Sequence, residues 1–295
     1  MNISQIQSFV ALAETGSFTE AAEQLYLSQS AISHALAALE RELGVTLIER
    51  NRKGVIALSE AGERILPHAR AFLSQVSAIE QEAKAAQGHY SGKLRLGSIH
   101  SFVAPDLLAP LLSHFQARYP EVEVTLFEGA IHEIGEWMES NLIDLSFMIL
   151  PAPDYTTRPI FGDELFVVLP QEHPLQECDT LRLDDLLDHG LVVERGHCTL
   201  RLMEQLGIIS HAKKPKIRYK AHDSATILAM VREGLGFTFM PKSMLPKQTD
   251  GLIVRALEPR FPLQIGLGVK SWQQASPNAR LFIEAAQQWA NQTSA

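Results

Sequence analysis

The sequence predicts an all-α N-terminal unit, one long helix after it, and a C-terminal α/β unit. Three observations predict this order. Short apolar patterns of helical spacing fill residues 4–43, and apolar residues recur every three or four positions over residues 59–87. From Leu94 onward, strand patterns and helix patterns alternate. Such alternation is typical of a sheet with helices packed on its faces.

Two short helices joined by a tight connection are the most informative feature of the chain. Ser17 and Glu20 have the spacing of a capping box at the start of the first helix, and Ser28 can cap the second. The second helix has an apolar stripe, formed by Ile32, Ala35, Leu36, Leu39 and Leu43. Its opposite face carries small or hydrogen-bonding side chains: Gln29, Ser30, Ser33, His34 and Ala37. A solvated face would normally carry Glu and Lys, so this face predicts a partner.

DNA is a suitable partner for that face. The major groove admits one helix and offers donor and acceptor edges to Gln, Ser and His side chains. Residues 47–58 follow as two short apolar strands around a turn that contains Gly54. The basic residues of this hairpin are Arg50, Arg52 and Lys53, which can reach phosphates or a minor groove as a wing. The alternatives are an ordinary helical hairpin with a polar outer face and a basic hairpin that faces solvent.

A set of short motifs runs through the first 65 residues. The motifs are Ala21-Ala22, Leu27-Ser28-Gln29-Ser30-Ala31-Ile32-Ser33, Leu39-Glu40, Leu43-Gly44, Leu47-Ile48-Glu49-Arg50 and Leu58-Ser59-Glu60-Ala61-Gly62. Together they resemble the DNA-binding unit of LysR-type transcriptional regulators, and the layout of the remaining chain fits that family. The resemblance implies an N-terminal all-α winged helix-turn-helix over residues 1–58, a linker and dimerisation helix over 59–90, and a sensing domain over 91–295. That domain is an α/β two-lobed periplasmic-binding-protein-like unit, with lobe I at 91–161 and 267–295 and lobe II at 162–266.

The same resemblance implies the function. It implies a sequence-specific transcription regulator that is controlled by a small-molecule effector or an oxidant in the cleft between the lobes. The implied partners are double-stranded DNA, RNA polymerase and further copies of the chain, as a dimer or a homotetramer. The rival hypothesis is a ligand-binding module whose N-terminal helices make protein contacts only. Its support is charge, because the first 60 residues hold four basic and seven acidic residues, which gives −3.

The long helix over residues 59–87 carries a heptad seam. The seam consists of Ile65, Ala69, Phe72, Val76, Ile79 and Ala83, with steps of four and three residues. This spacing predicts dimerisation, which would pair two DNA-reading units for a two-fold operator. The alternative is that the stripe packs against the core of its own chain.

Several predicted strand ends are expected to face the cleft between the lobes. Ser98, His100 and Ser101 follow the first strand and precede a helix, where hydroxyls and backbone amides suit a carboxylate. The other candidate effector contacts are Gly129, Phe147, Arg195, His197 and Thr238. Arg195 is the natural partner of an anionic effector, although a surface ion pair is the alternative.

Cys198 is a candidate redox site. It stands at an expected helix start with cationic residues nearby, a setting that lowers the pKa of a thiol. The segment Gly196-His197-Cys198 is similar to one in the peroxide-sensing members of the LysR family. Their second cysteine is absent, because residues 206–209 read Leu-Gly-Ile-Ile. Cys178 could take its place only if the fold brought the two thiols together, and an inert buried thiol is the alternative.

Composition and motifs argue against several other classes of protein. The net charge of −8 over 295 residues argues against a general nucleic-acid binder. The two cysteines predict no disulfide framework, and the lack of a long apolar run predicts no membrane span or secretory signal, so a cytoplasmic protein is expected. Enzyme signatures fail: the segment from His132 to Glu136 lacks the second histidine of a zinc motif. We therefore expect no catalysis, no cofactor and no metal.

Overall fold

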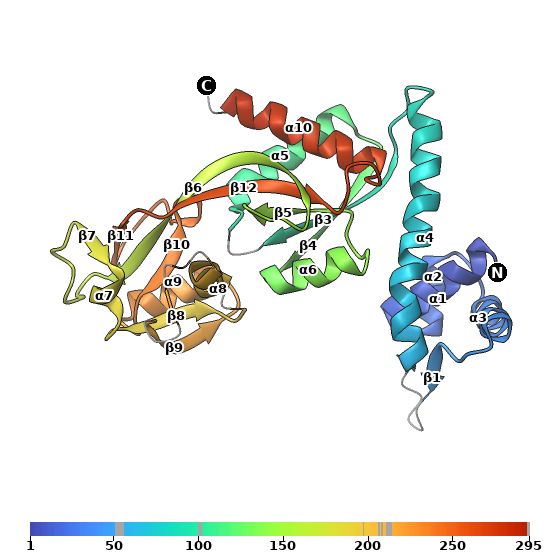
Figure 1. The fold of residues 1–295 in the computed structure, drawn as a ribbon, viewed down its shortest axis with the longest axis horizontal. Helices are drawn as coiled ribbons and strands as arrows, with labels where there is room; N and C mark the ends of the chain where they lie inside the picture. The colour runs from blue at the N-terminus through green and yellow to red at the C-terminus, as the bar shows by residue number, and fades with distance from the viewer. Residues whose placement is uncertain are drawn as a thin grey trace.

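The computed structural model describes residues 1–50, 56–99, 102–196, 198–205, 207, 209–210 and 214–293. The chain forms a helical N-terminal unit, a long helix and an α/β unit (Figure 1). The long helix lies between the other two parts in that view. Within the described ranges, no helix is long and apolar enough to cross a membrane.

The N-terminal unit consists of three helices and a small hairpin. Its elements are α1 (Ile3–Thr15), α2 (Phe18–Gln24), α3 (Gln29–Leu43), β1 (Ile48–Arg50) and β2 (Ile56–Leu58). The helix starts follow the sequence prediction, because the Ser17 hydroxyl accepts from the amide of Glu20 and the Ser28 hydroxyl accepts from the amide of Ala31. Each cap satisfies a backbone donor that has no partner inside its helix.

One apolar core holds this unit together. Its fully buried side chains include Phe9, Leu12, Ile32, Leu39 and Leu47, so α1, α3 and the hairpin share a single interior. Truncation of such a side chain to alanine costs about 2–5 kcal/mol. The orientation of α3 is therefore set by burial and not by its polar residues.

The long helix α4 (Glu60–Ala85) begins directly behind the hairpin. Ser59 caps it by accepting from the amide of Gly62 at 2.9 Å, and Ser59 also donates to the carbonyl of Thr46 at 2.5 Å. Gly62 is required at this point, because a Cβ there would lie 2.1 Å from the carbonyl oxygen of Leu47. The first turn of α4 is thus pressed against the hairpin backbone.

The α/β unit is built on a mixed sheet with the strand order β4-β3-β5-β12-β6-β11-β7. These strands are β3 (Gly92–Ile99), β4 (Val122–Gly129), β5 (Leu145–Ile149), β6 (Thr156–Pro170), β7 (Thr180–Arg182), β11 (Leu252–Glu258) and β12 (Pro262–Val269). β10 (Thr238–Pro241) also pairs with β6, and β8 (Gly190–Glu194) pairs with β9 (Lys216–Ala221) in a second sheet.

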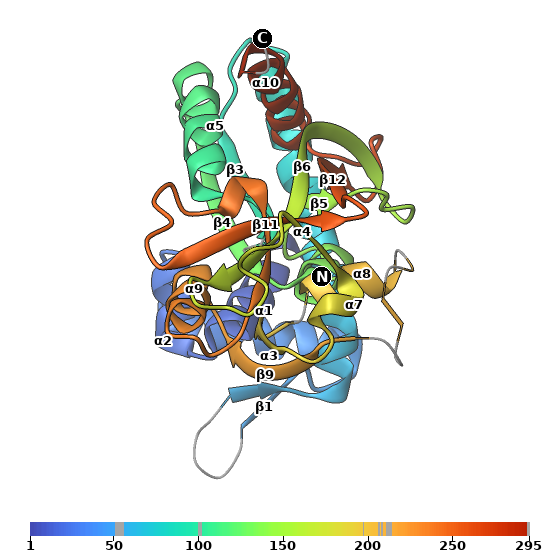
Figure 2. The ribbon, with the colours of Figure 1, turned by 90° about the vertical axis from the view of Figure 1, so that its left-hand side faces the viewer.

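Helices cover both faces of the first part of the sheet. α5 (Pro105–Arg118) and α10 (Pro277–Thr293) lie on one face, and α6 (Ile131–Glu139) lies on the other (Figure 1). The remaining helices are α7 (Leu183–Leu186), α8 (Cys198–Gln205), α9 (Ser224–Arg232) and the 3₁₀ turn η1 (Lys242–Met244). Figure 2 shows α5 and α10 together at the end of the molecule opposite the β1–β2 hairpin.

The long strand β6 joins two lobes. Its first part, Thr156 to Glu164, pairs with β12, whereas Leu165 to Pro170 pairs with β10 and β11. The chain returns to the first lobe between Glu258 and Pro262. The strand pairing of β6 therefore changes after Glu164, close to the predicted crossing at residue 162. The return between Glu258 and Pro262 lies a few residues before the predicted return at 266.

Two histidines lie against each other in the second lobe. The rings of His173 and His189 have centroids 4.5 Å apart, and the Nδ1 atom of His173 accepts from the amide of Leu175 at 3.2 Å. Burial, and then the proximity of His189, lowers the pKa of His173 from 6.5 to about 4. The folded protein thus holds His173 in its neutral form.

Gly62→Ala should lower the free energy of unfolding of the N-terminal unit by about 1–3 kcal/mol, because the added methyl group meets a backbone carbonyl that cannot rotate away. Gly135→Ala is the matched control, since a Cβ on this other helical glycine would lie 3.9 Å from its nearest neighbour. The control should gain about 0.5–1 kcal/mol from helix propensity. Thermal unfolding followed by circular dichroism compares them, and equal midpoints would refute the contact.

The stability contributed by neutral His173 should be complete above pH 6.5 and should be lost as the pH falls toward 4. In that window the unfolded chain binds a proton that the folded chain does not. His173→Asn keeps an acceptor near the Nδ1 position but does not titrate there. Urea unfolding at pH 7 and pH 4.5 should show a smaller loss of stability in this variant than in the native protein. An equal loss in both proteins would contradict the assignment.

Candidate nucleic-acid interface and inter-lobe pocket

The outer face of α3 is free. Ile32, Leu36 and Leu39 are buried in the helical core. Gln29, Ser30, His34 and Ala37 are exposed on the opposite side, and Ser33 is half-buried between the two sides. Figure 1 shows α3 at the end of the molecule, with α4 between it and the α/β unit. The exposed side chains of this face are therefore open to a partner.

Tyr26 is a candidate contact that the sequence reasoning missed. It lies in the connection between α2 and α3 with φ +55°, and 96% of its surface is exposed. A fully exposed aromatic ring beside a free helix start can donate its hydroxyl to a phosphate. The signal in the sequence was an aromatic residue in a tight turn.

Three of the seven acidic residues of this unit contact other groups of the chain. The Glu40 carboxylate accepts from the amides of Leu47 and Ile48 at 2.7 and 3.2 Å, so it anchors the hairpin to α3. Glu14 pairs with Arg70 at 3.1 Å, and Glu42 pairs with the α-amino group of Met1. The formal charge of −3 therefore overstates the negative potential near α3, because two of the carboxylates pair with cationic groups.

The basic wing residues are only partly placed. Arg52 and Lys53 lie outside the described residues, as does the side chain of Arg50. The strands on either side of them pair antiparallel, with Ile48 opposite Leu58. The predicted hairpin is therefore present at its base.

The heptad seam of α4 divides into two halves. Ala69 is buried in the helical core and Ile65 packs against that core. Phe72 and Ile79 are 42% and 70% exposed, Val76 is half-buried and Ala83 is exposed. The first half thus packs within the chain, whereas the second half is open to a partner.

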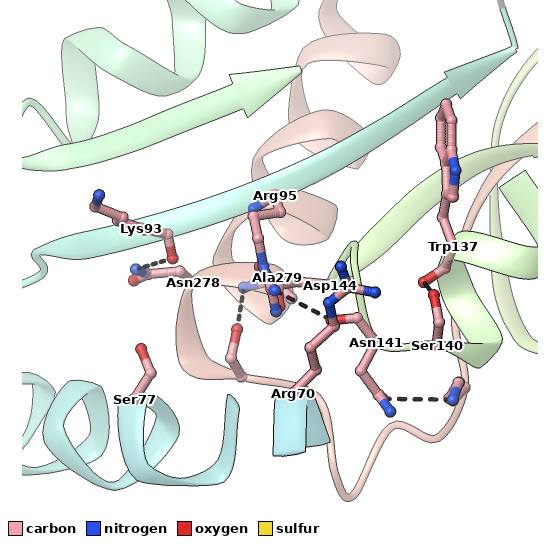
Figure 3. Close-up of polar contacts among 12 residues, drawn as sticks. Arg70, Ser77, Lys93, Arg95, Trp137, Ser140, Asn141, Asp144, Asn278 and Ala279 are labelled. Atoms are coloured by element: carbon pink, nitrogen blue, oxygen red, sulfur yellow. Dashed lines mark hydrogen bonds and ion pairs between the residues drawn. The ribbon is translucent and has the colours of Figure 1, made fainter. Parts of the chain in front are cut away.

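Polar contacts join α4 to the first lobe (Figure 3). The buried side chain of Gln81 donates to the carbonyl of Lys93 at 3.3 Å and accepts from the amide of Asn278 at 3.3 Å. Asn278 in turn donates to the carbonyl of Ser91 at 3.2 Å. One face of α4 is therefore fixed to β3 and to the start of α10.

A second contact reaches α4 from the end of α6. Asn141 adopts φ +55° and donates from Nδ2 to the carbonyl of Pro67 at 3.3 Å. Arg95 donates to the carbonyl of Asn141 at 3.1 Å and pairs with Asp144 at 2.6 Å (Figure 3). This cluster holds the loop after α6 against α4.

A cavity of about 500 Å³ lies between the lobes. Its wall in the first lobe includes Ile99 at the end of β3, Ile131 and Ile134 on α6, and Met148 on β5. Leu202 on α8 closes it from the second lobe, and Tyr155 and Asp154 supply polar groups. Pockets of this size and composition are typical of small-molecule sites.

Most of the predicted effector contacts lie elsewhere. Among those described, Ser98, Phe147 and Thr238 are 0, 0 and 2% exposed, and the buried Ser98 hydroxyl has no hydrogen-bond partner among the described residues. A Cβ on Gly129 would lie 2.6 Å from the Trp137 ring, and the Arg195 guanidinium lies 3.0 Å from Nε2 of His222. His100, Ser101 and His197 lie outside the described residues. The described part of the cavity wall is formed mostly by other, apolar residues. In the sequence these residues resemble ordinary core residues.

Cys198 begins α8, as expected, although its side chain lies outside the described residues. The buried Glu194 carboxyl group accepts from the amide of Thr199 at 2.6 Å, so it occupies this helix start. Cys178 is exposed and reduced.

Comparison with known families matches both parts of the chain. Residues 3–63 match the bacterial regulatory helix-turn-helix proteins of the lysR family, and residues 87–291 match the LysR substrate binding domain. The matched ranges contain the free face of α3 and the inter-lobe cavity.

Individual relatives agree with these matches. An uncharacterized HTH-type transcriptional regulator of Bacillus subtilis, YvbU, is 33% identical over 294 residues, which are 98% of each chain. A probable hydrogen peroxide-inducible genes activator of Streptomyces viridosporus is 32% identical, and the match covers 84% of this chain and 80% of the relative. A full-length OxyR variant of Pseudomonas aeruginosa has the same fold, with a TM-score of 0.75 at 24% identity over 97% of this chain and 98% of that one. The protein therefore belongs to the LysR family of DNA-binding transcriptional regulators, with a helix-turn-helix unit and an effector-binding domain.

Proposed function

We propose that α3 reads base edges in the major groove through Gln29, Ser30, Ser33 and His34. Arg50, Arg52 and Lys53 would hold the phosphate backbone or the minor groove, and Tyr26 would contact a phosphate. The observation that carries this proposal is the free polar face of α3, which lies opposite the buried Ile32 and Leu39. Hydroxyl, amide and imidazole groups on such a face are suited to base edges.

Several copies are needed for useful affinity. Each N-terminal unit contributes few basic residues, so single-site binding would be weak at physiological salt. We propose dimerisation through the open half of the α4 seam, where Phe72 and Ile79 are exposed. Two dimers joined through the domain at residues 91–295 would form a tetramer and bind adjacent half-sites together.

The inter-lobe cavity is proposed as the effector site. Its wall contains Ile131, Ile134 and Gly135 of α6, and the loop after α6 contacts α4 through Asn141. Movement of α6 on binding would therefore alter the contact to Pro67 and the direction of α4. A change in this direction would alter the spacing of two readers on DNA.

Oxidation of Cys198 is a second candidate trigger. It is favoured by the relative from Streptomyces viridosporus, whose name describes a probable activator of peroxide-inducible genes. Residues 206–209 contain no second cysteine, so we rank this trigger below a small-molecule effector. We also propose a cytoplasmic location, where the DNA is, and RNA polymerase as a further partner.

Ser33→Ala should weaken specific DNA binding about tenfold, which corresponds to the loss of one base contact. Alanine is also a better helix former than serine, so unfolding would not explain the loss. Ser113→Ala on the exposed side of α5 is the matched control and should bind as the native protein does. Gel-shift titration on the DNA upstream of its own gene measures both. Equally weak binding of the native protein to every DNA would favour the ligand-binding module instead.

Asn141→Gly should loosen α4 near Pro67 while the backbone keeps its positive φ. Loss of one hydrogen bond of about 1 kcal/mol predicts about fivefold faster hydrogen exchange of the amides around Pro67. Lys270→Met is the control, because it removes a contact to Oδ1 of Asn141 and leaves the bond to Pro67 in place. Unchanged exchange in Asn141→Gly would exclude this residue from the coupling.

A further inference from the structure

The described wall of the inter-lobe cavity offers an anion no cationic partner. Among the described residues of its wall there is one carboxylate, Asp154, and no cationic side chain. The remaining wall is mostly aliphatic, with Ile99, Ile131 and Met148 from the first lobe and Leu202 from the second. A negative charge placed against this described wall would lose its hydration and gain no ion pair from it, which is strongly unfavourable.

The polar groups at the rim do not change this conclusion. The pKa of Tyr155 is raised, first by burial and then by the negative charges of Glu139 and Asp154. Its hydroxyl therefore stays neutral, and because it is hydrogen-bonded to Glu139 it can still accept one hydrogen bond from an uncharged ligand. Arg195, which would have attracted an anion, lies beside His222 and is not part of the described wall.

We propose that the effector is an uncharged, mostly hydrocarbon small molecule with at most one or two hydrogen-bonding groups. The inference rests on the proposed function, in which this cavity is the effector site. It names the chemical class of the ligand and replaces the anionic effector that Arg195 and Ser98 suggested from the sequence.

Gly135 offers a way to test the site without damage to the fold. This residue lies in α6 and lines the cavity, and a Cβ there would be 3.9 Å from the Tyr155 hydroxyl. Leucine at this position would project into the cavity, whereas alanine would fill little of it. Both residues favour a helix more than glycine does, so α6 should persist in both variants.

The experiment uses the full-length protein and two fluorescent probes that share one ring scaffold. N-phenyl-1-naphthylamine is uncharged, and 1-anilinonaphthalene-8-sulfonate adds a sulfonate to it. We expect the uncharged probe to bind at least about tenfold more tightly than the sulfonate, a difference that exceeds ordinary titration error. Gly135→Leu should weaken the uncharged probe about tenfold or more, and Gly135→Ala should stay within about twofold.

Three results would overturn the proposal. One is equal or tighter binding of the sulfonate, a second is binding of the uncharged probe that Gly135→Leu does not weaken, and the third is no binding of either probe. Gel-shift titration of the same samples distinguishes failure of this proposal from failure of the proposed function. Loss of specific DNA binding would refute the regulator while the probe preference stands. A bound probe that leaves DNA binding unchanged would remove the effector role from the cavity but not its preference for uncharged ligands.

Discussion

Burial of one side of α3 is the constraint on which the rest of the structure depends. Ile32 and Leu39 are fully buried beside Phe9 and Leu12, so α3 cannot rotate without exposing its apolar stripe. Rotation would cost several kcal/mol, by the usual value of about 2–5 kcal/mol for each large buried side chain. The polar face is therefore displayed rigidly, which is what the reading of a base sequence requires.

The same rigidity continues into α4 and the first lobe. Gly62 lets α4 press against the hairpin, and Gln81 and Asn141 fix α4 to the α/β unit. α6 connects the two ends of this arrangement, because it forms part of the cavity wall and its C-terminal end leads to Asn141. A ligand in the cavity and a duplex at α3 would thus be coupled through a short series of packed elements. The coupling would need only α6, which lines the cavity and leads at its C-terminal end to the Asn141 contact with α4. A rearrangement of the whole lobe would not be required.

Local chemistry made much of the fold predictable. Ser17 and Ser28 marked helix starts, and the alternating patterns after Leu94 indicated the α/β unit, as the structure confirms. β7 and α7 are only three and four residues long, too short for a periodic signal, and they escaped prediction. The cavity could not be predicted, because Ile99 and Leu202 are distant in sequence and each resembles a core residue. Arg195 and Ser98 have suitable chemistry for a ligand, but Arg195 lies beside His222 and Ser98 is fully buried.

Methylation interference on a DNA fragment that the protein retains is the most direct test of the central claim. If the free face of α3 lies in the major groove, methylation of guanine N7 within each half-site should abolish retention of those fragments. The interfering guanines should fall in two clusters about one helical turn apart or a multiple of it. Retention that no guanine N7 methylation affects would show that α3 does not read DNA in this way.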